Sequence, residues 1–313
     1  METLQFTVPQ KLHSYRLDMA LVSLASGLSR RKIRQIIDVG GCYQNKKRVK
    51  IASRPVHQGD RLLLQFSERG LKLFKTAQPA LSAHHILRRE GGVIAINKPP
   101  GLPIQATKEQ SQLHLISALS KYLRQTDKTE NRATELYLAH RLDRETSGVV
   151  LVAESQLVCD RLMAGFRERE FIKEYHALVV GIPRENEFTV KCGLRKNGQY
   201  CTVHVAKKGG KDSETHFQVI KCYPQWGISL VACRPVTGRT HQIRVHLASK
   251  GLPILGDKAY GERPKSLAKD LLALVHYHQL HARQITHPDL PFLKGLIAPY
   301  PPSFSALLKL VDP

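Results

Sequence analysis

The sequence predicts an α+β protein with a small N-terminal domain and a larger domain that contains antiparallel strands. The chain has 313 residues, which is long enough for two domains. Serine N-caps at Ser29 and Ser155 each precede a segment with apolar residues at helical spacing. Alternation of apolar and polar residues, which is typical of antiparallel strands, recurs near residues 188–192, 200–206, 214–222 and 227–233.

Positive charge dominates the composition. The chain has 48 Lys and Arg residues but 26 Asp and Glu residues, which gives a formal charge of +22. Such an excess is typical of a nucleic-acid-binding protein, with an anionic membrane surface as the rival partner. No apolar run approaches the roughly 20 residues that a bilayer span needs, and no basic amphipathic anchor is evident. We therefore expect RNA or DNA as the partner and no membrane.

Cysteine usage and the N-terminus indicate the compartment. Six cysteines occur without a Cys-x-x-Cys pair, which favours free thiols in a reducing cytoplasm over a disulfide framework. The first ten residues include Glu2 and lack a long apolar core, so we do not expect a secretory signal. The predicted location is the cytoplasm.

Residues 12–75 form the predicted N-terminal domain. Apolar residues at helical spacing predict a first helix that ends near Gly27, and Ser29 is the predicted N-cap of a second helix. A hairpin at residues 43–49 and a strand at residues 61–66 complete the domain. The apolar positions of the two helices are Leu17, Ala20, Leu21 and Leu24, and then Ile33, Ile36 and Ile37.

Basic residues are concentrated in the same domain. It contains fourteen Lys or Arg residues and four acidic ones. The second helix has arginines off its apolar face and the hairpin has a basic tip, so both can meet nucleic-acid phosphates. A solvated basic surface on a structural domain is the alternative interpretation. The residues predicted to bind RNA are Arg30, Arg31, Arg34, Lys46, Lys47 and Arg48.

Residues 76–83 are predicted to be a linker, and residues 84–313 a second domain. Two strands near residues 86–89 and 93–96 are joined by a glycine turn. Three prolines within residues 97–103 end the second strand in an irregular loop. Further strands are predicted at 149–153, at 171–180 and after residue 280, and helices at 115–123, 155–166, 240–251, 267–275 and 307–310.

A charged loop that leads into a buried strand organises the second domain. Residues 140–148 read HRLDRETSG, and the apolar run that follows predicts a strand covered on both faces. Gly148 allows the backbone to bend between loop and strand. Asp143 lies among arginines, and nearby positive charge keeps a carboxylate ionised. Such carboxylates sometimes mark active sites, although an ordinary surface loop with ion pairs has the same composition.

Two further segments contain residues that can bind ligands. Arg239 precedes a predicted helix, where an arginine and the helix N-terminus can hold a phosphate. A capped structural helix is the simpler interpretation of that segment alone. His276, His278 and His281 are close in sequence, but no acidic or cysteine partner completes a metal-ligand pattern. We predict no metal site.

The N-terminal domain resembles a small RNA-binding domain that was first known from a small-subunit ribosomal protein and is present in many RNA-modifying enzymes. The order and spacing of its motifs match, over about a fifth of the chain. The resemblance implies a small α/β domain that binds RNA. The motifs are YRLD at residues 15–18, LSRRKIR at 28–34 and GD at 59–60.

The larger domain, over roughly residues 84–308, resembles the RluA-type family of pseudouridine synthases. The resemblance implies a mixed, largely antiparallel sheet flanked by helices, with the active site in a cleft across it. It also implies isomerisation of uridine within RNA, with neither a metal nor an organic cofactor. The motifs are HRLDRETSG at 140–148, KEYHA at 173–177, TGRTHQIRVHL at 237–247, PILGD at 253–257 and LHA at 280–282.

The same resemblance implies roles for individual residues. Asp143 would be the catalytic carboxylate, as a nucleophile or as a base. Arg244 would pair with it, and Tyr175 would stack on the uracil and help to remove a proton from carbon. Leu280 would pack on the base. The residues expected to contact the rest of the substrate are His140, Arg141 and Arg239.

Several readings of the function stay open at this stage. Large-subunit (23S) ribosomal RNA is the favoured substrate, and transfer RNA is the alternative. A non-catalytic RNA-binding protein of ribosome assembly would share the basic charge but would not need the chemistry of Asp143. A base-removing N-glycosylase would release free uracil instead of retaining it. We expect the protein to act as a monomer.

Overall fold

The computed structural model describes residues 2–49, 51–67, 71, 81–105, 114–126, 135–197, 202–205, 209–261 and 267–312. The chain divides into two compact units. The smaller unit contains the described residues 2–67, and the larger contains most of the described residues from 81 onwards. Of the predicted linker at 76–83, residues 76–80 lie outside the described part of the chain.

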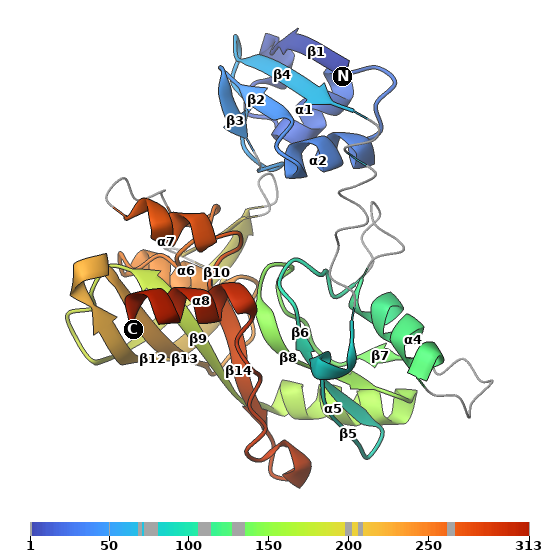
Figure 1. The fold of residues 1–313 in the computed structure, drawn as a ribbon, viewed down its shortest axis with the longest axis vertical. Coiled ribbons are helices and arrows are strands. Elements are labelled where there is room, and N and C mark those ends of the chain that lie inside the picture. The colour runs from blue at the N-terminus through green and yellow to red at the C-terminus, as the bar shows by residue number, and fades with distance from the viewer. Residues whose placement is uncertain are drawn as a thin grey trace. The chain divides into compact units, whose positions relative to one another are not determined.

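The N-terminal unit is a four-stranded antiparallel sheet packed on two helices (Figure 1). The predicted helices and hairpin are confirmed, and Ser29 caps the second helix by accepting from the amide of Lys32. Strand β1 precedes the predicted start of this domain and pairs along its whole length with β4. The elements are β1 (Glu2–Thr7), α1 (Leu17–Leu24), α2 (Arg30–Asp38), β2 (Cys42–Gln44), β3 (Lys47–Val49) and β4 (Arg61–Phe66).

The larger unit is built on one ten-stranded sheet. Its strands are β5 (Ile86–Glu90), β6 (Val93–Lys98), β7 (Tyr137–Leu138), β8 (Ser147–Ala153), β9 (Ile172–Val180), β10 (Glu187–Asn197), β11 (Thr202–Val205), β12 (Lys211–Tyr223), β13 (Ile228–Pro235) and β14 (Leu280–Thr286). Its helices are α4 (Leu115–Thr126), α5 (Gln156–Glu168), α6 (Gln242–Ser249), α7 (Lys269–Leu274) and α8 (Pro302–Val311).

The sheet is mixed and largely antiparallel, as predicted. The main path runs β11-β10-β12-β13-β9-β14-β8-β6-β5, and β7 pairs with β8. Among the described strand pairs, only β14 and β8 are parallel. Gly148 lies at this parallel pair, where a Cβ would approach the carbonyl oxygen of Ala282 to 2.1 Å. A side chain at this position would therefore separate the two strands.

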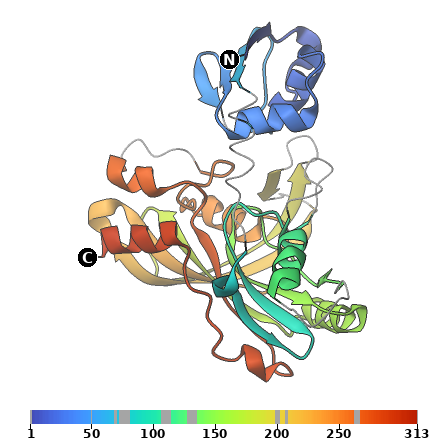
Figure 2. The same cartoon turned by 45° about the vertical axis from the view of Figure 1, so that its right-hand side comes forward.

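Helices cover both faces of the sheet. Alternate residues of β6 and β8 face α4 on one side and α5 on the other, so these strands are buried on both faces. In the same way, α6 packs on one face of β9 and β13, while α7 and α8 pack on the opposite face. Figures 1 and 2 show α4 and α5 beside β6 and β8, and α6 to α8 beside β9 and β13. The prediction of a fully covered strand after residue 148 is confirmed.

No helix in the described ranges combines the length and the apolar character that a membrane span requires. The described cysteines, which are Cys42, Cys159, Cys192, Cys222 and Cys233, are all free thiols.

Candidate active site

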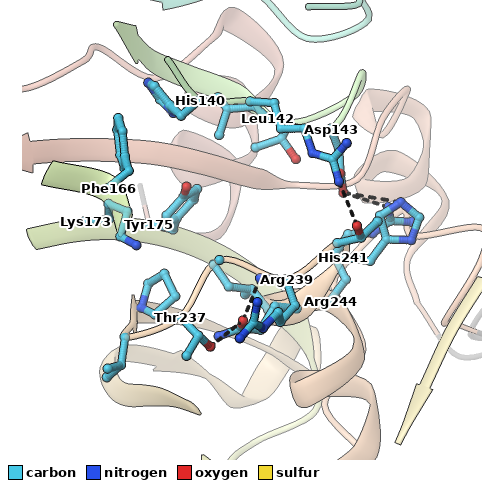
Figure 3. Close-up of a pocket in the computed structure, with 18 of the residues that line it drawn as sticks. His140, Leu142, Asp143, Phe166, Lys173, Tyr175, Thr237, Arg239, His241 and Arg244 are labelled. Atoms are coloured by element: carbon cyan, nitrogen blue, oxygen red, sulfur yellow. Dashed lines mark hydrogen bonds and ion pairs between the residues drawn. The ribbon is translucent and has the colours of Figure 1, made fainter. Parts of the chain in front are cut away.

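A pocket of about 480 Å³ lies where four segments of the larger unit meet (Figure 3). This volume is within the range of about 300–1,000 Å³ that is usual for ligand sites. The four segments are the loop before β8, the end of α5 with the start of β9, the segment from β13 into α6, and the start of β14. The pocket brings together all seven residues that the sequence predicted for catalysis and substrate contact: His140, Arg141, Asp143, Tyr175, Arg239, Arg244 and Leu280.

Arg244 joins two carboxylates at the base of the pocket. Its Nη1 donates to Asp143 Oδ2 at 2.9 Å. Its Nε and Nη2 donate to the two carboxylate oxygens of Asp257 at 2.6 and 2.8 Å. The Asp257 side chain is 1% exposed, whereas the Asp143 side chain is 26% exposed. Asp257 thus holds the guanidinium in place, and Asp143 presents the carboxylate that a substrate can reach.

Asp143 remains ionised in this environment. Burial alone would raise its pKa, but the charges of His241 and Arg244 and the hydrogen bond from Arg244 outweigh burial and lower the pKa below its usual value. Arg244 Nη1 and His241 Nε2 both approach Oδ2. Oδ1 accepts no hydrogen bond from the residues that the structure describes. A charged oxygen is therefore available to a bound substrate.

The buried Lys98 fixes the loop that carries Asp143. Its Nζ donates to the carbonyl oxygens of Pro99, Leu102 and Arg144, each at 3.0 Å. Burial lowers the pKa of Lys98 to about 7, and the charge of Asp143 opposes this shift. Because Lys98 ends β6 and Arg144 follows Asp143, one side-chain nitrogen ties the proline-rich loop to the loop of Asp143.

Two neighbouring strands supply the apolar wall of the pocket. Tyr175 on β9 pairs in register with Ala282 on β14, and Leu280 pairs with Ala177. Both Tyr175 and Leu280 line the pocket. Burial, followed by the charge of Asp143, raises the pKa of the Tyr175 phenol, so the hydroxyl stays protonated. The hydroxyl has no hydrogen-bond partner among the described residues and is available to a ligand.

His241 and Tyr260 extend the charged network at the pocket. His241 precedes α6 in a left-handed conformation, with φ of 55°. Its Nδ1 lies 2.6 Å from the Tyr260 hydroxyl, and its Nε2 lies 3.7 Å from Asp143 Oδ2. The Tyr260 ring lies against the Arg244 guanidinium, with 4.9 Å between the ring centre and Cζ. The rings of His241 and Tyr260 therefore restrict the positions of the Asp143 carboxylate and the Arg244 guanidinium.

The predicted substrate-contact residues other than Leu280 differ in how firmly the protein holds their side chains. His140 Nε2 accepts from the Leu151 amide at 2.8 Å, and burial lowers its pKa to about 3, so this imidazole is neutral and anchored. The ring lines the pocket, so substrate contact by His140 stays a prediction. Arg141 Nη2 donates to Thr240 Oγ1 at 2.8 Å. Arg239 is exposed and donates through Nε to the Asp212 carbonyl.

The segment before α6 is held by hydrogen bonds within the protein, and phosphate binding by Arg239 stays a prediction. Gln242 fixes this segment through its side chain, whose Oε1 accepts from the Arg239 amide at 2.9 Å and from the Thr237 hydroxyl at 2.7 Å. Its Nε2 donates to Glu214 and Thr215 on β12. These internal contacts fix the loop that leads into α6.

The C-terminal histidines serve the packing of the sheet. His278 Nε2 contacts the Thr146 hydroxyl at 2.8 Å, and His281 lies between the Ser147 hydroxyl and the Ala298 carbonyl. In the ranges that the structure describes, no group of three His, Cys, Asp or Glu residues is arranged to hold a metal ion.

The predicted RNA-binding arginines of α2 are not all free. Asp18 is fully buried and accepts ion pairs from Arg16 at 2.9 Å, Arg30 at 3.0 Å and Arg34 at 3.4 Å. An aspartate on α1 thus holds both Arg30 and Arg34, which the sequence did not predict, and their contact with RNA stays a prediction. Arg31 is exposed.

The hairpin tip of the N-terminal unit matches its prediction more closely. Lys46, Lys47 and Arg48 are all exposed. Arg48 donates to the Tyr43 hydroxyl at 2.8 Å and lies over the Tyr43 ring. Lys46 occupies a left-handed position in the turn, with φ of 65°. These three cations are open to a partner.

Sequence reasoning missed several residues of the pocket and its support: Lys98, Phe166, Lys173, His241, Asp257 and Tyr260. Three of them, Lys173, His241 and Asp257, lie inside the motifs that carried the family resemblance, so their positions were marked but given no role. Phe166 was predicted as a buried residue of a helix. Lys98 lies in a proline-rich loop that carried no functional signal.

Comparison with family models identifies both units. A model described as "RNA pseudouridylate synthase" matches residues 92–249, and a model of the S4 domain matches residues 16–62. The chain is 30% identical, over 88% of its length and 85% of the relative, to an uncharacterized RNA pseudouridine synthase of Aquifex aeolicus (strain VF5).

Relatives with a more specific description also match. A "ribosomal large subunit pseudouridine synthase C" of Vibrio cholerae is 33% identical over 82% of this chain and 80% of the relative. The protein of the same description from Rickettsia prowazekii (strain Madrid E) is 33% identical over 74% and 70%. Among solved structures, human RNA pseudouridylate synthase domain containing 4 superposes with a TM-score of 0.59 at 26% identity, over 72% of this chain and 92% of that chain.

Proposed function

Because the chain belongs to the RluA-type family of RNA pseudouridine synthases and is an isomerase with an S4 RNA-binding domain, we propose that it converts uridines of large-subunit ribosomal RNA into pseudouridine. The reaction breaks the bond between uracil N1 and ribose C1′. The base turns, a bond forms between C1′ and C5, C5 loses its proton, and N1 gains one. Atoms balance without a further reactant, because the product is an isomer of the substrate.

Asp143 is the proposed catalytic residue, and the free Oδ1 beside an Arg244-bound Oδ2 is the observation that carries this proposal. An ionised carboxylate with one unoccupied oxygen can approach the ribose of a bound uridine, as a nucleophile or as a base. Arg244 and Asp257 hold that carboxylate in one orientation. Pre-positioning of this kind lowers the barrier of the chemical step.

Tyr175 and Leu280 are proposed to hold the uracil. They lie on adjacent strands and line the same pocket, so a flat base fits between them and the loop of Asp143. Since the Tyr175 phenol stays protonated in the free protein, we assign it stacking and hydrogen-bond donation. The target uridine has to leave the RNA stack to reach this pocket. Arg141 and Arg239 then remain as contacts to the flanking RNA.

The choice of ribosomal RNA rests on the relatives. The relatives described as acting on the ribosomal large subunit are about 33% identical over 74–82% of this chain. The S4 domain supplies a second RNA-binding surface, which suits a large folded RNA. A cytoplasmic monomer fits the free thiols and the predicted composition.

Chemical mapping of pseudouridine in total RNA tests this proposal. We expect specific positions in large-subunit ribosomal RNA to lose the modification in cells that lack the protein, and to regain it on expression of the wild type but not of Asp143→Asn. Loss of modified positions in transfer RNA instead would replace the proposed substrate. Release of free uracil by the purified protein would replace the reaction.

A further inference from the structure

Lys173 is a pocket residue to which the proposed mechanism gives no task. It lies on β9 two positions before Tyr175, and residues two apart on a strand share a face. Both side chains line the pocket, and Figure 3 shows Lys173 on the same wall as Tyr175 and Phe166. The two residues are about 6.6 Å apart along the strand. Lys173 therefore lies beside the place proposed for the uracil.

The Lys173 ammonium has no hydrogen bond or ion pair with any residue that the structure describes. Two other cations of the pocket are held by the protein. Arg244 is bound by Asp143 and Asp257, and Arg141 by Thr240. Unlike Arg244 and Arg141, Lys173 is therefore available to a partner that comes from outside the protein.

Positive charge surrounds Lys173. Of the residues that line the described pocket, Asp143 is the one carboxylate, and it is paired with Arg244. Burial, and next the charge of Arg169, lower the pKa of Lys173. A partly buried cation among other cations favours an anionic partner, because an anion offsets both the burial and the repulsion.

We propose that Lys173 binds a phosphate of the RNA backbone next to the extruded uridine. The proposal rests on the proposed function for the identity of the ligand as RNA, and it adds a contact that positions the nucleotide. Tyr175 fixes the plane of the base, and Lys173 fixes the adjacent backbone. Two contacts on one rigid strand set the distance between the base and its phosphate, which favours one nucleotide position over its neighbours.

The experiment measures affinity for a transcript of large-subunit ribosomal RNA as a function of salt, with wild type, Lys173→Met and Lys173→Arg. Each phosphate contact to a single strand contributes about 0.7 to the slope of log affinity against log salt. We expect Lys173→Met to reduce the slope by about 0.7, and Lys173→Arg to retain it because the charge is kept. Lys309→Met is the matched control, since Lys309 is an exposed lysine of α8, which packs on the opposite face of the sheet from Tyr175.

Single-turnover release of the C5 proton, followed with tritium-labelled transcript, completes the test. We expect Lys173→Arg to keep the rate at saturating RNA. Parallel salt plots for wild type and Lys173→Met would overturn the phosphate contact. A collapse of the saturated rate in folded Lys173→Arg would overturn it as well, because it would assign Lys173 to proton transfer. A wild type that binds with the expected slope but releases no tritium would disprove the proposed function and leave the phosphate contact standing.

Discussion

The two units of the protein use the same ion pair in opposite proportions. In the N-terminal unit one buried carboxylate, Asp18, is shared by three guanidinium groups. In the larger unit one guanidinium, that of Arg244, is shared by the carboxylates of Asp143 and Asp257. The first arrangement leaves positive charge in excess in the cluster around Asp18, and the second leaves negative charge in excess in the cluster around Arg244.

The difference follows the chemistry that each unit needs. A surface that holds RNA has to meet phosphates, and arginines fixed on one aspartate present their remaining N–H groups in a defined pattern. A site that acts on the ribose needs an ionised carboxylate whose second oxygen is open. A buried acid is stable only when it is paired, so Arg244 stabilises both acids while occupying a single oxygen of Asp143.

The strongest test of this comparison removes the negative charge of Asp143. We expect Asp143→Asn to lower the single-turnover rate at least about 10³-fold, because asparagine keeps the shape but is neither a nucleophile nor a base. RNA affinity should change little, since the S4 domain is untouched. The rate is measured by tritium release from labelled RNA, with thermal unfolding and filter binding as controls. A well-folded variant that still forms pseudouridine at a substantial rate would end the catalytic assignment.

The second test removes the guanidinium between the two acids. We expect Arg244→Met to lower the free energy of unfolding by about 3–5 kcal/mol, because both Asp143 and Asp257 lose their buried partner. Addition of Asp257→Asn should restore part of this stability, since one of the two unpaired charges is gone. Chemical denaturation of the single and double variants measures the effect. Equal stability of the two variants would contradict a shared role for Arg244.

The folded double variant also predicts a change in pH dependence. In the wild type the pKa of Asp143 is below its usual value, so we expect the acidic limb of the pH–rate profile at a lower pH than an ordinary aspartate would give. Without Arg244 the burial effect is less opposed and the pKa rises. We therefore expect the acidic limb to move to higher pH, measured as single-turnover rate against pH. A limb that stays in place would show that Arg244 does not set the charge of Asp143.

The third test addresses the N-terminal unit. We expect Asp18→Asn to lower the free energy of unfolding of the whole protein by about 2 kcal/mol, because Arg16, Arg30 and Arg34 lose a common buried acceptor. Burial raises the pKa of Asp18, but the three arginines outweigh burial and lower it. Asp18 therefore stabilises the fold above its unfolded-state pKa of about 3.9, and this contribution is lost as pH falls through the lower folded-state value.

A pH series of unfolding measures this contribution. The difference in stability between wild type and Asp18→Asn should be largest near neutral pH and should shrink as the solution becomes more acidic than the folded-state pKa. A difference that is constant over this range would show that the loss comes from hydrogen-bond geometry and not from the charge.

Local sequence patterns predicted the elements of both units well. Apolar spacing located α1 and α2, and the uninterrupted apolar run located β8, because these patterns depend only on neighbours in the chain. The residues of the pocket were located through the motifs of the family resemblance. Strand β1 was missed, since its partner β4 lies more than fifty residues further along the chain.

Contacts that depend on the sheet order were beyond the sequence. Neither the parallel pairing of β8 with β14 nor the bond from Lys98 to the Arg144 carbonyl follows from a local pattern. The ties of Arg30 and Arg34 to Asp18 were missed for a different reason. Helical spacing showed that these arginines leave the apolar face of α2, but it could not show that an aspartate of another helix is buried beside them.

The smallest effect is expected from a direct comparison of two groups of cations in the N-terminal unit, those of the hairpin and those of α2. Replacement of Lys46, Lys47 and Arg48 by glutamine should flatten the salt dependence of RNA affinity by up to about 2.7 units, because three exposed cations each contribute about 0.9 on duplex RNA, if the value for B-DNA holds. The α2 triple variant replaces Arg30, Arg31 and Arg34. Of these three, Arg31 is the one that forms no ion pair with Asp18. We therefore expect the slope of this variant to fall by about 0.9 and its stability to fall as well.

Salt titrations of RNA affinity for wild type and the two triple variants show which of these cations contact phosphate, with Arg31→Gln as the single-site control. If Arg31→Gln and the α2 triple variant share one slope, the guanidiniums held by Asp18 are structural. If the α2 triple variant flattens the plot as much as the hairpin variant, Arg30 and Arg34 bind phosphate while paired with Asp18. In that case the buried Asp18 carboxylate orients Arg30 and Arg34 toward RNA. Arg244 holds Asp143 in the pocket in the same way, so in both units a buried ion fixes the position of the charged group that meets the substrate.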